Sequence, residues 1–265
     1  KCGCIEDAHL VFYRMPNTNV ISWTAMIAAA AECGWSKEVT LLLQKMQFEG
    51  VAPDKITFAS SLSSCVKHES LLDGLWLHAC ISRSGLESDV VVGTALITMY
   101  GKCGRMNSAQ QLFEAMPIKD PTMWNALIIG YSRQGECEYA LYTFERMKET
   151  TRPDAVTFLC VLTACNHGGL IDRAQEYFES MNEYGVPSSI KHHNCMLDLL
   201  VILTLGVIQR AENFFSLSNI MLLAVYDLLC RSFLSHTLFR ACIYFIKWYQ
   251  NRKSERGKLP TERKC

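Results

Sequence analysis

Apolar residues between positions 121 and 154 recur at the spacing of an α-helix in two successive stretches. Trp124, Leu127, Ile128 and Tyr131 would lie on one face of a first helix. Gly135 then interrupts the pattern. A second helical stretch follows, with the apolar residues Ala140, Leu141, Phe144 and Met147. The pattern therefore predicts two antiparallel helices joined by a turn at the glycine.

The same pattern recurs along the chain. The turn glycines are Gly3, Gly34, Gly104, Gly135 and the pair Gly168-Gly169. Five residues after the turn lies Ala8, Val39, Ala109, Ala140 or Ala174. Nine residues after it lies Phe12, Leu43, Phe113, Phe144 or Phe178, and twelve after it Met15, Met46, Met116, Met147 or Met181. We expect the helices to break at the glycines and these three ladders to form the core. A period in the low thirties is typical of a solenoid.

These marks divide the chain into helix pairs that cannot bury both faces alone and must therefore stack on their neighbours. The complete units are 20–54, 55–89, 90–120, 121–154 and 155–189. Residues 1–19 form a partial unit, 190–216 a degenerate final unit, and 217–265 a diverged C-terminal region. The predicted fold is all-α: a right-handed α-α superhelix, a tetratricopeptide-like solenoid of helix-turn-helix repeats.

Composition narrows the function less than the repeat does. The chain has 26 Lys and Arg against 26 Asp and Glu, so charge gives no support for nucleic-acid binding. Its 13 cysteines, an odd number in a chain of 265 residues, favour reduced thiols inside a cell. The sequence begins at Lys1 rather than at methionine, so any targeting peptide would lie upstream.

Unit lengths of 35, 35, 31, 34 and 35 residues, with the terminal Asp and the Gly-Ala-Phe-Met ladder, resemble the plant pentatricopeptide repeat proteins. The order of units is similar to the subclass in which ordinary, long and short repeats alternate. Units 20–54 and 121–154 resemble the ordinary type, 55–89 and 155–189 the long type, and 90–120 the short type. The resemblance implies single-stranded RNA binding, with one repeat facing one nucleotide.

In the family, the fifth and last residues of a repeat meet the base edge, and the second residue packs on the base. Carried over, the base-reading pairs are Thr24 with Asp54, Thr94 with Asp120, and Asn125 with Asp154. The stacking residues are Ile21, Val91 and Thr122. The family's code then implies, from 5′ to 3′, guanine at 20–54, an unread base at 55–89, guanine at 90–120 and uracil at 121–154.

A simpler role exists for the last residues, because Asp before a helix is a common N-cap. Asp89 illustrates it, since Ala59 stands at the fifth position of its unit and offers no polar partner. The other long unit pairs Leu159 with Ser189, so we assign no base to either long unit. Capping and base reading both stay open for the three complete pairs.

No catalytic or metal-binding spacing stands out. A cytidine deaminase needs His-x-Glu followed by Cys-x-x-Cys, and neither occurs. Cys2, Cys33 and Cys103 share one repeat position, and Cys65 and Cys165 another, so we predict buried packing residues. The doublet His192-His193 is interpreted as helix surface. We expect no enzyme activity, no metal, no cofactor and no small-molecule substrate.

The C-terminal quarter keeps little of the repeat. Residues 220–249 are apolar but contain Asp227, Arg231, His236, Arg240 and Lys247, and no uncharged run of the C-terminal quarter reaches the roughly 20 residues that span a membrane. We interpret the region as a diverged helical cap, with a mistranslated or truncated end as the alternative, and we expect no membrane partner. The basic tail 247–264 is interpreted as solvated.

Two functions follow. The resemblance implies recognition of an organellar transcript in a mitochondrion or chloroplast, for RNA processing or for RNA editing, where a deaminase or editing-complex protein would act in trans. The alternative is a helical-repeat scaffold that binds protein. Variable polar pairs at fixed positions favour RNA, whereas the neutral charge and the small number of complete pairs favour the scaffold.

Overall fold

The computed structural model describes residues 5–65 and 70–199, and every regular element within them is helical. The chain divides into two compact units, residues 1–192 and 193–265, and the helices discussed below belong to the first. A further helix begins at residue 190 and continues through 199. The other elements are α1 (Ile5–Arg14), α2 (Val20–Glu32), α3 (Ser36–Phe48), α4 (Lys55–Ser63), α5 (Leu71–Arg83), α6 (Val90–Lys102), α7 (Met106–Ala115), α8 (Pro121–Arg133), α9 (Cys137–Thr150), α10 (Ala155–Gly168) and α11 (Ile171–Ser180).

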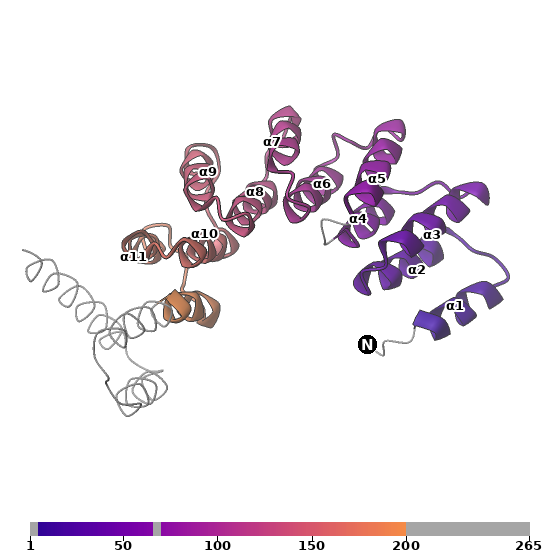
Figure 1. The fold of residues 1–265 in the computed structure, drawn as a ribbon, viewed down its shortest axis with the longest axis horizontal. Helices are drawn as coiled ribbons and strands as arrows, with labels where there is room; N and C mark the ends of the chain where they lie inside the picture. Colours follow the sequence, from indigo (N-terminus) through magenta and orange to yellow (C-terminus); the bar gives the residue numbers. More distant parts are fainter. Residues whose placement is uncertain (1–4, 66–69, 200–265) are drawn as a thin grey trace, which may run out of the picture. The chain divides into compact units, whose positions relative to one another are not determined.

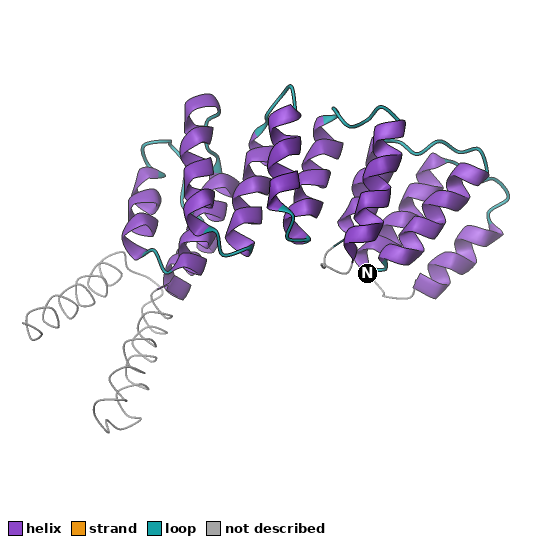
Figure 2. Cartoon of the chain, turned by 45° about the horizontal axis from the view of Figure 1, so that its top comes forward, coloured by secondary structure: helices purple, strands orange, loops and turns teal. Residues whose placement is uncertain are grey.

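The helices form pairs that stack along the chain. We call α2, α4, α6, α8 and α10 the first helices, and α3, α5, α7, α9 and α11 the second helices. Each first helix packs against the next first helix and against the second helix of its own pair. Figure 1 shows α6, α8 and α10 in a row, with α7 and α9 together on one side of it. In Figure 2 the described residues form only helices and loops. The predicted all-α solenoid of helix-turn-helix repeats is confirmed.

The turns lie at the predicted glycines. Gly34, Gly104, Gly135 and Gly169 have φ between 64° and 77°. This left-handed region is sterically unfavourable for a residue with a Cβ atom and routine for glycine. Each of these glycines directly follows a first helix or its C-cap, so it reverses the chain into the second helix. Gly3 lies outside the described residues.

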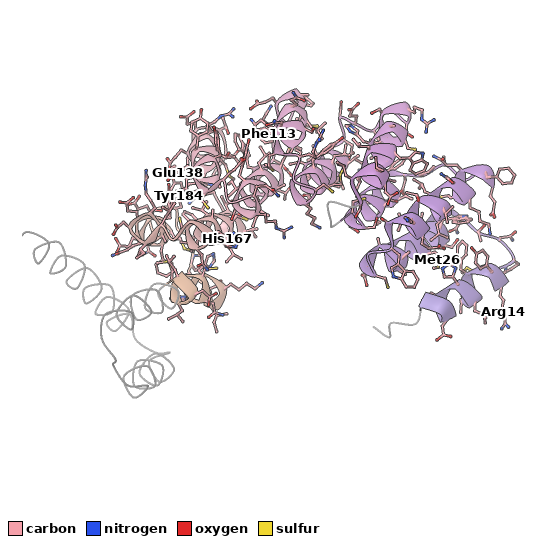
Figure 3. The ribbon with its side chains drawn as sticks, in the orientation of Figure 1. Arg14, Met26, Phe113, Glu138, His167 and Tyr184 are labelled. Carbon is pink, nitrogen blue, oxygen red and sulfur yellow. The ribbon has the colours of Figure 1, made fainter. Side chains whose placement is uncertain are left out.

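The three ladders form the core between the helices. The predicted small, Phe or Leu, and Met positions of α3, α7 and α9 are all buried. Phe113 of α7, labelled in Figure 3, meets Trp124 of α8 edge to face, with ring centroids 4.5 Å apart. Complete burial of one such side chain stabilises the fold by about 1.5–3 kcal/mol. The stack is thus held by side chains that bridge successive repeats.

The prediction fails at the N-terminal end of the stack. Met15 is 44% exposed, and Cys33 is exposed although Cys103 at the same repeat position is buried. Both lie where α1 has no first helix of its own within this sequence, so no upstream layer covers them. Ala8 and, in the last helix pair, Phe178 are only half-buried. Cys65 and Cys165 are buried as predicted, and Cys2 lies outside the described residues.

Two first helices approach so closely that their backbones touch. A Cβ atom on Gly101 of α6 would lie 3.2 Å from the Cα of Gly130 in α8. Few real Cβ contacts are that short, and a backbone atom cannot rotate aside. Glycine at both positions therefore allows α6 and α8 to pack tightly, which brings their side chains together at the surface described next.

The doublet His192-His193 was interpreted as helix surface, and this is wrong for His192, which is buried. Its Nδ1 lies 3.0 Å from the backbone N–H of Ser189 and accepts from it, so Nε2 carries the proton and donates to the carbonyl of Ala155 at 2.7 Å. The imidazole ring of His192 therefore joins two helices.

Within the described residues, no helix is long and apolar enough to cross a membrane. The predictions for 200–265 lie outside the described part of the chain.

Candidate nucleic-acid interface

The last residues of the units cap the first helices that follow them. Oδ1 of Asp54 accepts the backbone N–H of Thr57 at 2.7 Å and its hydroxyl at 2.8 Å. Asp154 makes the same two bonds with Thr157, at 2.8 Å and 2.9 Å. Side chains at the other first-helix N-termini act likewise: Asn19, Asp89 and Asp120. Each cap stabilises its helix by about 1 kcal/mol. The simpler role of these residues is therefore confirmed.

Capping leaves part of two carboxylates unused. At Asp54 and Asp154 the bonds from the capped threonine both fall on Oδ1, so Oδ2 of each carboxylate takes no part in them. At Asp120, by contrast, the hydroxyl of Thr122 lies 2.8 Å from each carboxylate oxygen. Burial alone would raise the pKa of Asp54, but the hydrogen bonds from Thr57 lower it below 3.8. Asp54 is thus an ionised acceptor at neutral pH, and capping does not prevent it from meeting a base.

The three predicted fifth residues have different surroundings. The hydroxyl of Thr24 lies 2.7 Å from the hydroxyl of Thr57, which belongs to the next unit. The hydroxyl of Thr94 donates to the carbonyl of Val90 in its own helix at 2.8 Å. Asn125 is 7% exposed, and its Oδ1 is buried without a hydrogen-bond partner. An unpartnered buried polar atom costs about 1–3 kcal/mol, so a donor supplied by a ligand would be favourable there.

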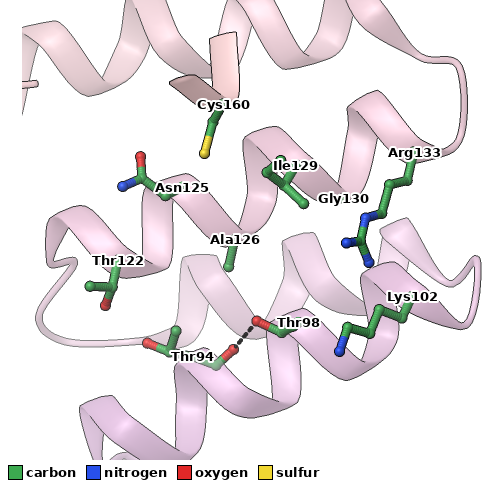
Figure 4. A pocket seen from close by; sticks show the side chains of 10 residues that line it. All are labelled: Thr94, Thr98, Lys102, Thr122, Asn125, Ala126, Ile129, Gly130, Arg133 and Cys160. Carbon is green, nitrogen blue, oxygen red and sulfur yellow. Dashed lines mark hydrogen bonds between the residues drawn. The ribbon is translucent and has the colours of Figure 1, made fainter. Parts of the chain in front are cut away.

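A hollow of about 230 Å³ lies over the first helices α6, α8 and α10. Three predicted site residues line it: Thr94, Thr122 and Asn125. Figure 4 shows these three at one end, and Lys102 with Arg133 at the other. Six predicted residues are not among those that line it: Ile21, Thr24, Asp54, Val91, Asp120 and Asp154. The structure therefore brings the fifth residues of two adjacent units to one surface.

Sequence reasoning missed Lys102 and Arg133. Each is the last residue of a first helix, α6 or α8, where the negative end of the helix dipole favours a cation. Burial lowers the pKa of Lys102, and the neighbouring charge of Arg133 lowers it further. Two like charges beside an open hollow favour an anion such as a phosphodiester. The sequence did contain a signal for them, because Lys102 and Arg133 occupy the same position in their repeat units. The zero net charge of the whole chain obscures this local pair of cations.

The predicted stacking residues form an exposed series. Ile21 is 75% exposed, and Val91 and Thr122 are also exposed. The long units place Ile56 and Val156 at the same second position, and both are exposed as well. Sequence reasoning left these two out because their units lack a polar pair. Exposed β-branched side chains at one repeat position offer apolar surface on which a flat ring can pack.

Comparisons with known proteins agree with this architecture. The family model for the PPR repeat matches residues 21–51, 94–120, 122–150 and 156–186. An Arabidopsis thaliana pentatricopeptide repeat-containing protein named as chloroplastic/mitochondrial is 37% identical over 207 residues, which cover 76% of this chain and 32% of the relative. The pentatricopeptide repeat-containing protein CRR2 of the same plant, named as chloroplastic, is 39% identical over 204 residues, 76% of this chain and 31% of the relative. The chain thus spans about a third of the length of these relatives.

Solved structures resemble the chain too. The pentatricopeptide repeat protein PPR10 from maize superposes with a TM-score of 0.60 at 25% identity, covering 75% of this chain and 30% of PPR10. PPR10 in complex with an 18-nucleotide psaJ RNA element gives a TM-score of 0.63 at 20% identity, covering 80% of this chain and 31% of that one. With the stacked helix pairs and their glycine turns, these matches show that the chain carries pentatricopeptide repeats.

Proposed function

We propose that the chain binds single-stranded RNA along its first helices. One nucleotide would face each unit that has a complete base-reading pair. The observation that supports this most is Asn125, whose buried Oδ1 lacks a partner although the side chain lines a hollow open to solvent. Among the described residues, five buried side-chain atoms lack a partner, and Asn125 is the one of these five residues that lines the hollow. An N–H group on the edge of a base would pair it. The structure of PPR10 with an RNA element is of the same fold.

The proposed reading follows the three pairs. Thr24 with Asp54 and Thr94 with Asp120 would each select guanine, and Asn125 with Asp154 would select uracil. The bases would stack on Ile21, Val91 and Thr122, and the strand would run 5′ to 3′ along the chain. Stacking contributes about 1–3 kcal/mol per base without regard to its identity. Discrimination must therefore come from hydrogen bonds to the pairs.

The phosphates would be held locally. Lys102 and Arg133 lie at one end of the hollow, while the base-reading side chains lie at the other. A nucleotide has its phosphate and its base edge at opposite ends, so the two groups of side chains suit its two ends. A local phosphate contact of this kind is compatible with the zero net charge of the chain, because it requires only the two cations beside the hollow.

The wider role we propose is organellar. Relatives named as chloroplastic or mitochondrial support a transcript in one of these compartments. There the chain would select a site for RNA processing or for the editing of a cytidine to uridine, a reaction that a deaminase would perform in trans. Crosslinking in isolated organelles, followed by sequencing of the attached RNA, would identify the transcript.

Binding of short RNAs tests the proposal directly. The purified chain is titrated against labelled 12-nucleotide RNAs that contain G-N-G-U or a permutation of it, at one fixed salt concentration. We expect the G-N-G-U strand to bind at least about tenfold more tightly than a strand in which the three read bases are permuted, since each correct contact contributes about 1 kcal/mol and two contacts change. Equal binding of all permutations would refute sequence-dependent recognition.

A protein scaffold is the second candidate. It is favoured by large apolar side chains that are exposed on the second helices: Leu41, Leu72, Leu75, Tyr139 and Tyr142. Replacing Tyr139 and Tyr142 with serine should leave RNA binding unchanged if RNA lies on the first helices. A loss of RNA binding in this variant would indicate that RNA contacts the second helices and would contradict the proposed interface on the first helices.

A further inference from the structure

One buried hydroxyl connects the two residues of the first base-reading pair. Thr57 is the third residue of the next unit, and none of its surface is exposed. Its hydroxyl oxygen lies 2.7 Å from the hydroxyl oxygen of Thr24 and 2.8 Å from Oδ1 of Asp54. The fifth and last residues of unit 20–54 are therefore joined through a side chain that cannot itself touch RNA.

The direction of the protons in this connection follows from the acceptors. The hydroxyl of Thr57 has one proton, and the ionised carboxylate of Asp54 is a stronger acceptor than a neutral hydroxyl. Thr57 therefore donates to Asp54, and Thr24 must donate to Thr57. The proton of Thr24 is then committed, which leaves only its lone pairs for a ligand. The pair as a whole presents two acceptors, the hydroxyl oxygen of Thr24 and Oδ2 of Asp54.

Two acceptors side by side suit one purine better than the other. Guanine carries two adjacent donors on its Watson–Crick edge, the ring N1–H and the exocyclic amino group. Adenine carries a donor next to an acceptor on that edge, so one of its contacts would set two acceptors against each other. A fixed pair of acceptors should therefore favour guanine.

The second Thr–Asp pair lacks this connection although its two residues are the same. The third residue of the following unit is Met123, which has no hydroxyl. Thr94 donates to Val90 of its own helix, and Asp120 binds the backbone N–H of Met123 and the hydroxyl of Thr122. Thr94 and Asp120 are thus held independently of one another.

We propose that Thr57 is a positioning residue that fixes Thr24 and Asp54 as a rigid pair of acceptors and so sets the preference for guanine over adenine at unit 20–54. This inference rests on the proposed function. It follows that identical Thr–Asp pairs are not equivalent, and that the third residue of the next repeat adjusts how strictly a pair discriminates.

The test compares the binding of RNAs with guanine or adenine opposite unit 20–54, using the full 265-residue chain. Thr57→Val removes the hydroxyl and keeps the side-chain shape, while Thr57→Ser keeps the hydroxyl. We expect the guanine-to-adenine affinity ratio to fall about three- to tenfold in Thr57→Val, toward the ratio measured at unit 90–120, and to persist in Thr57→Ser. One hydrogen bond of ordinary strength corresponds to a change of this size.

Thr157→Val supplies the matched control. Thr157 is also fully buried and makes the same capping bonds, with Asp154, but Oδ1 of the fifth residue Asn125 has no partner, so no such connection exists there. Thr157→Val should lose a similar amount of stability and leave the purine ratio opposite unit 20–54 unchanged. A purine preference that moves as much in this control as in Thr57→Val would show a general effect of weakened capping and would overturn the inference.

The remaining outcomes separate the inference from the function on which it rests. An unchanged purine ratio in Thr57→Val, with wild type still preferring guanine, would overturn the role of Thr57 alone. Loss of the preference in both Thr57→Val and Thr57→Ser would assign the effect to packing and likewise overturn it. Wild type that binds RNA without any base preference would refute the proposed function itself.

Discussion

Replacing Asp154 with asparagine should change which pyrimidine the fourth unit of the stack prefers. The structure makes this substitution selective, because Oδ1 of Asp154 accepts both capping bonds from Thr157 and Oδ2 takes no part in them. Asparagine retains one oxygen that can cap the helix equally well. Its amino group replaces the oxygen that is left for a base. The cap is therefore preserved while an acceptor becomes a donor.

The expected magnitude follows from the two pyrimidines. Uracil has a donor at N3 and would lose a bond to a charged acceptor, worth about 1.5–3 kcal/mol. Cytosine has an acceptor at N3 and would gain a neutral bond, worth about 0.5–1.5 kcal/mol. The two changes act together on the ratio of affinities. Because Asp154 is exposed and water competes for it, we expect the lower sum of about 2 kcal/mol, a shift of about thirtyfold from uracil toward cytosine.

The assay is a titration of wild type and Asp154→Asn with G-N-G-U and G-N-G-C strands at fixed salt. Asp89→Asn is the control, since Asp89 also caps a first helix, α6, by accepting the backbone N–H groups of Val91 and Val92, but its unit has Ala59 at the fifth position. This control should leave the uracil-to-cytosine ratio opposite unit 121–154 as it is in wild type. If Asp154→Asn also has the wild-type ratio, Asp154 is only a helix cap and its base-reading role is wrong.

Three further predictions concern the phosphate contact, the helix packing and the buried thiols. Arg133→Gln should weaken RNA binding without changing base preference and should reduce the slope of log K against log salt by about one unit; an unchanged slope would exclude a phosphate contact. Gly101→Ala should lower the free energy of unfolding by about 1–3 kcal/mol in chemical denaturation, because its Cβ meets the backbone of Gly130; wild-type stability would show that α6 and α8 can separate freely. Stability should fall as the pH rises from 9 to 11, because burial raises the pKa of Cys65 from 9.0 to about 11 and that of Cys165 to about 12, so these thiols ionise first in the unfolded chain. Thermal unfolding across that range checks this, and Cys65→Ala should flatten the decline.

The repeat architecture could be predicted from the sequence because its causes are local or periodic. Gly34, Gly104 and Gly135 lie at turns with a positive φ. Glycine adopts this conformation readily because it lacks a Cβ atom, so the residue type alone indicates the turn. The Ala, Phe and Met ladders recur at fixed offsets, so one copy predicts the burial of the others. The prediction fails at Met15 and Cys33, where the periodic pattern continues but the stack has no upstream neighbour within this sequence.

The site was predictable only in part. The pairs and stacking positions came from counting along each unit, and Thr94, Thr122 and Asn125 do line one hollow. Counting could not show that Oδ1 of Asn125 lacks a partner. It also could not show that Lys102 and Arg133 lie at the same end of this hollow, since the overall charge of the chain conceals where its cations lie.

The differences between units were decided by tertiary structure. Thr24 and Thr57 are separated by 33 positions, and their hydroxyls meet because α2 and α4 pack side by side. Thr94 has the same residue type and the same repeat position as Thr24, yet it bonds to its own helix. A repeat pattern specifies which side chains face a neighbouring helix. Which hydrogen bond each one makes depends on the distances and directions of atoms across that interface, and only the packed helices set these.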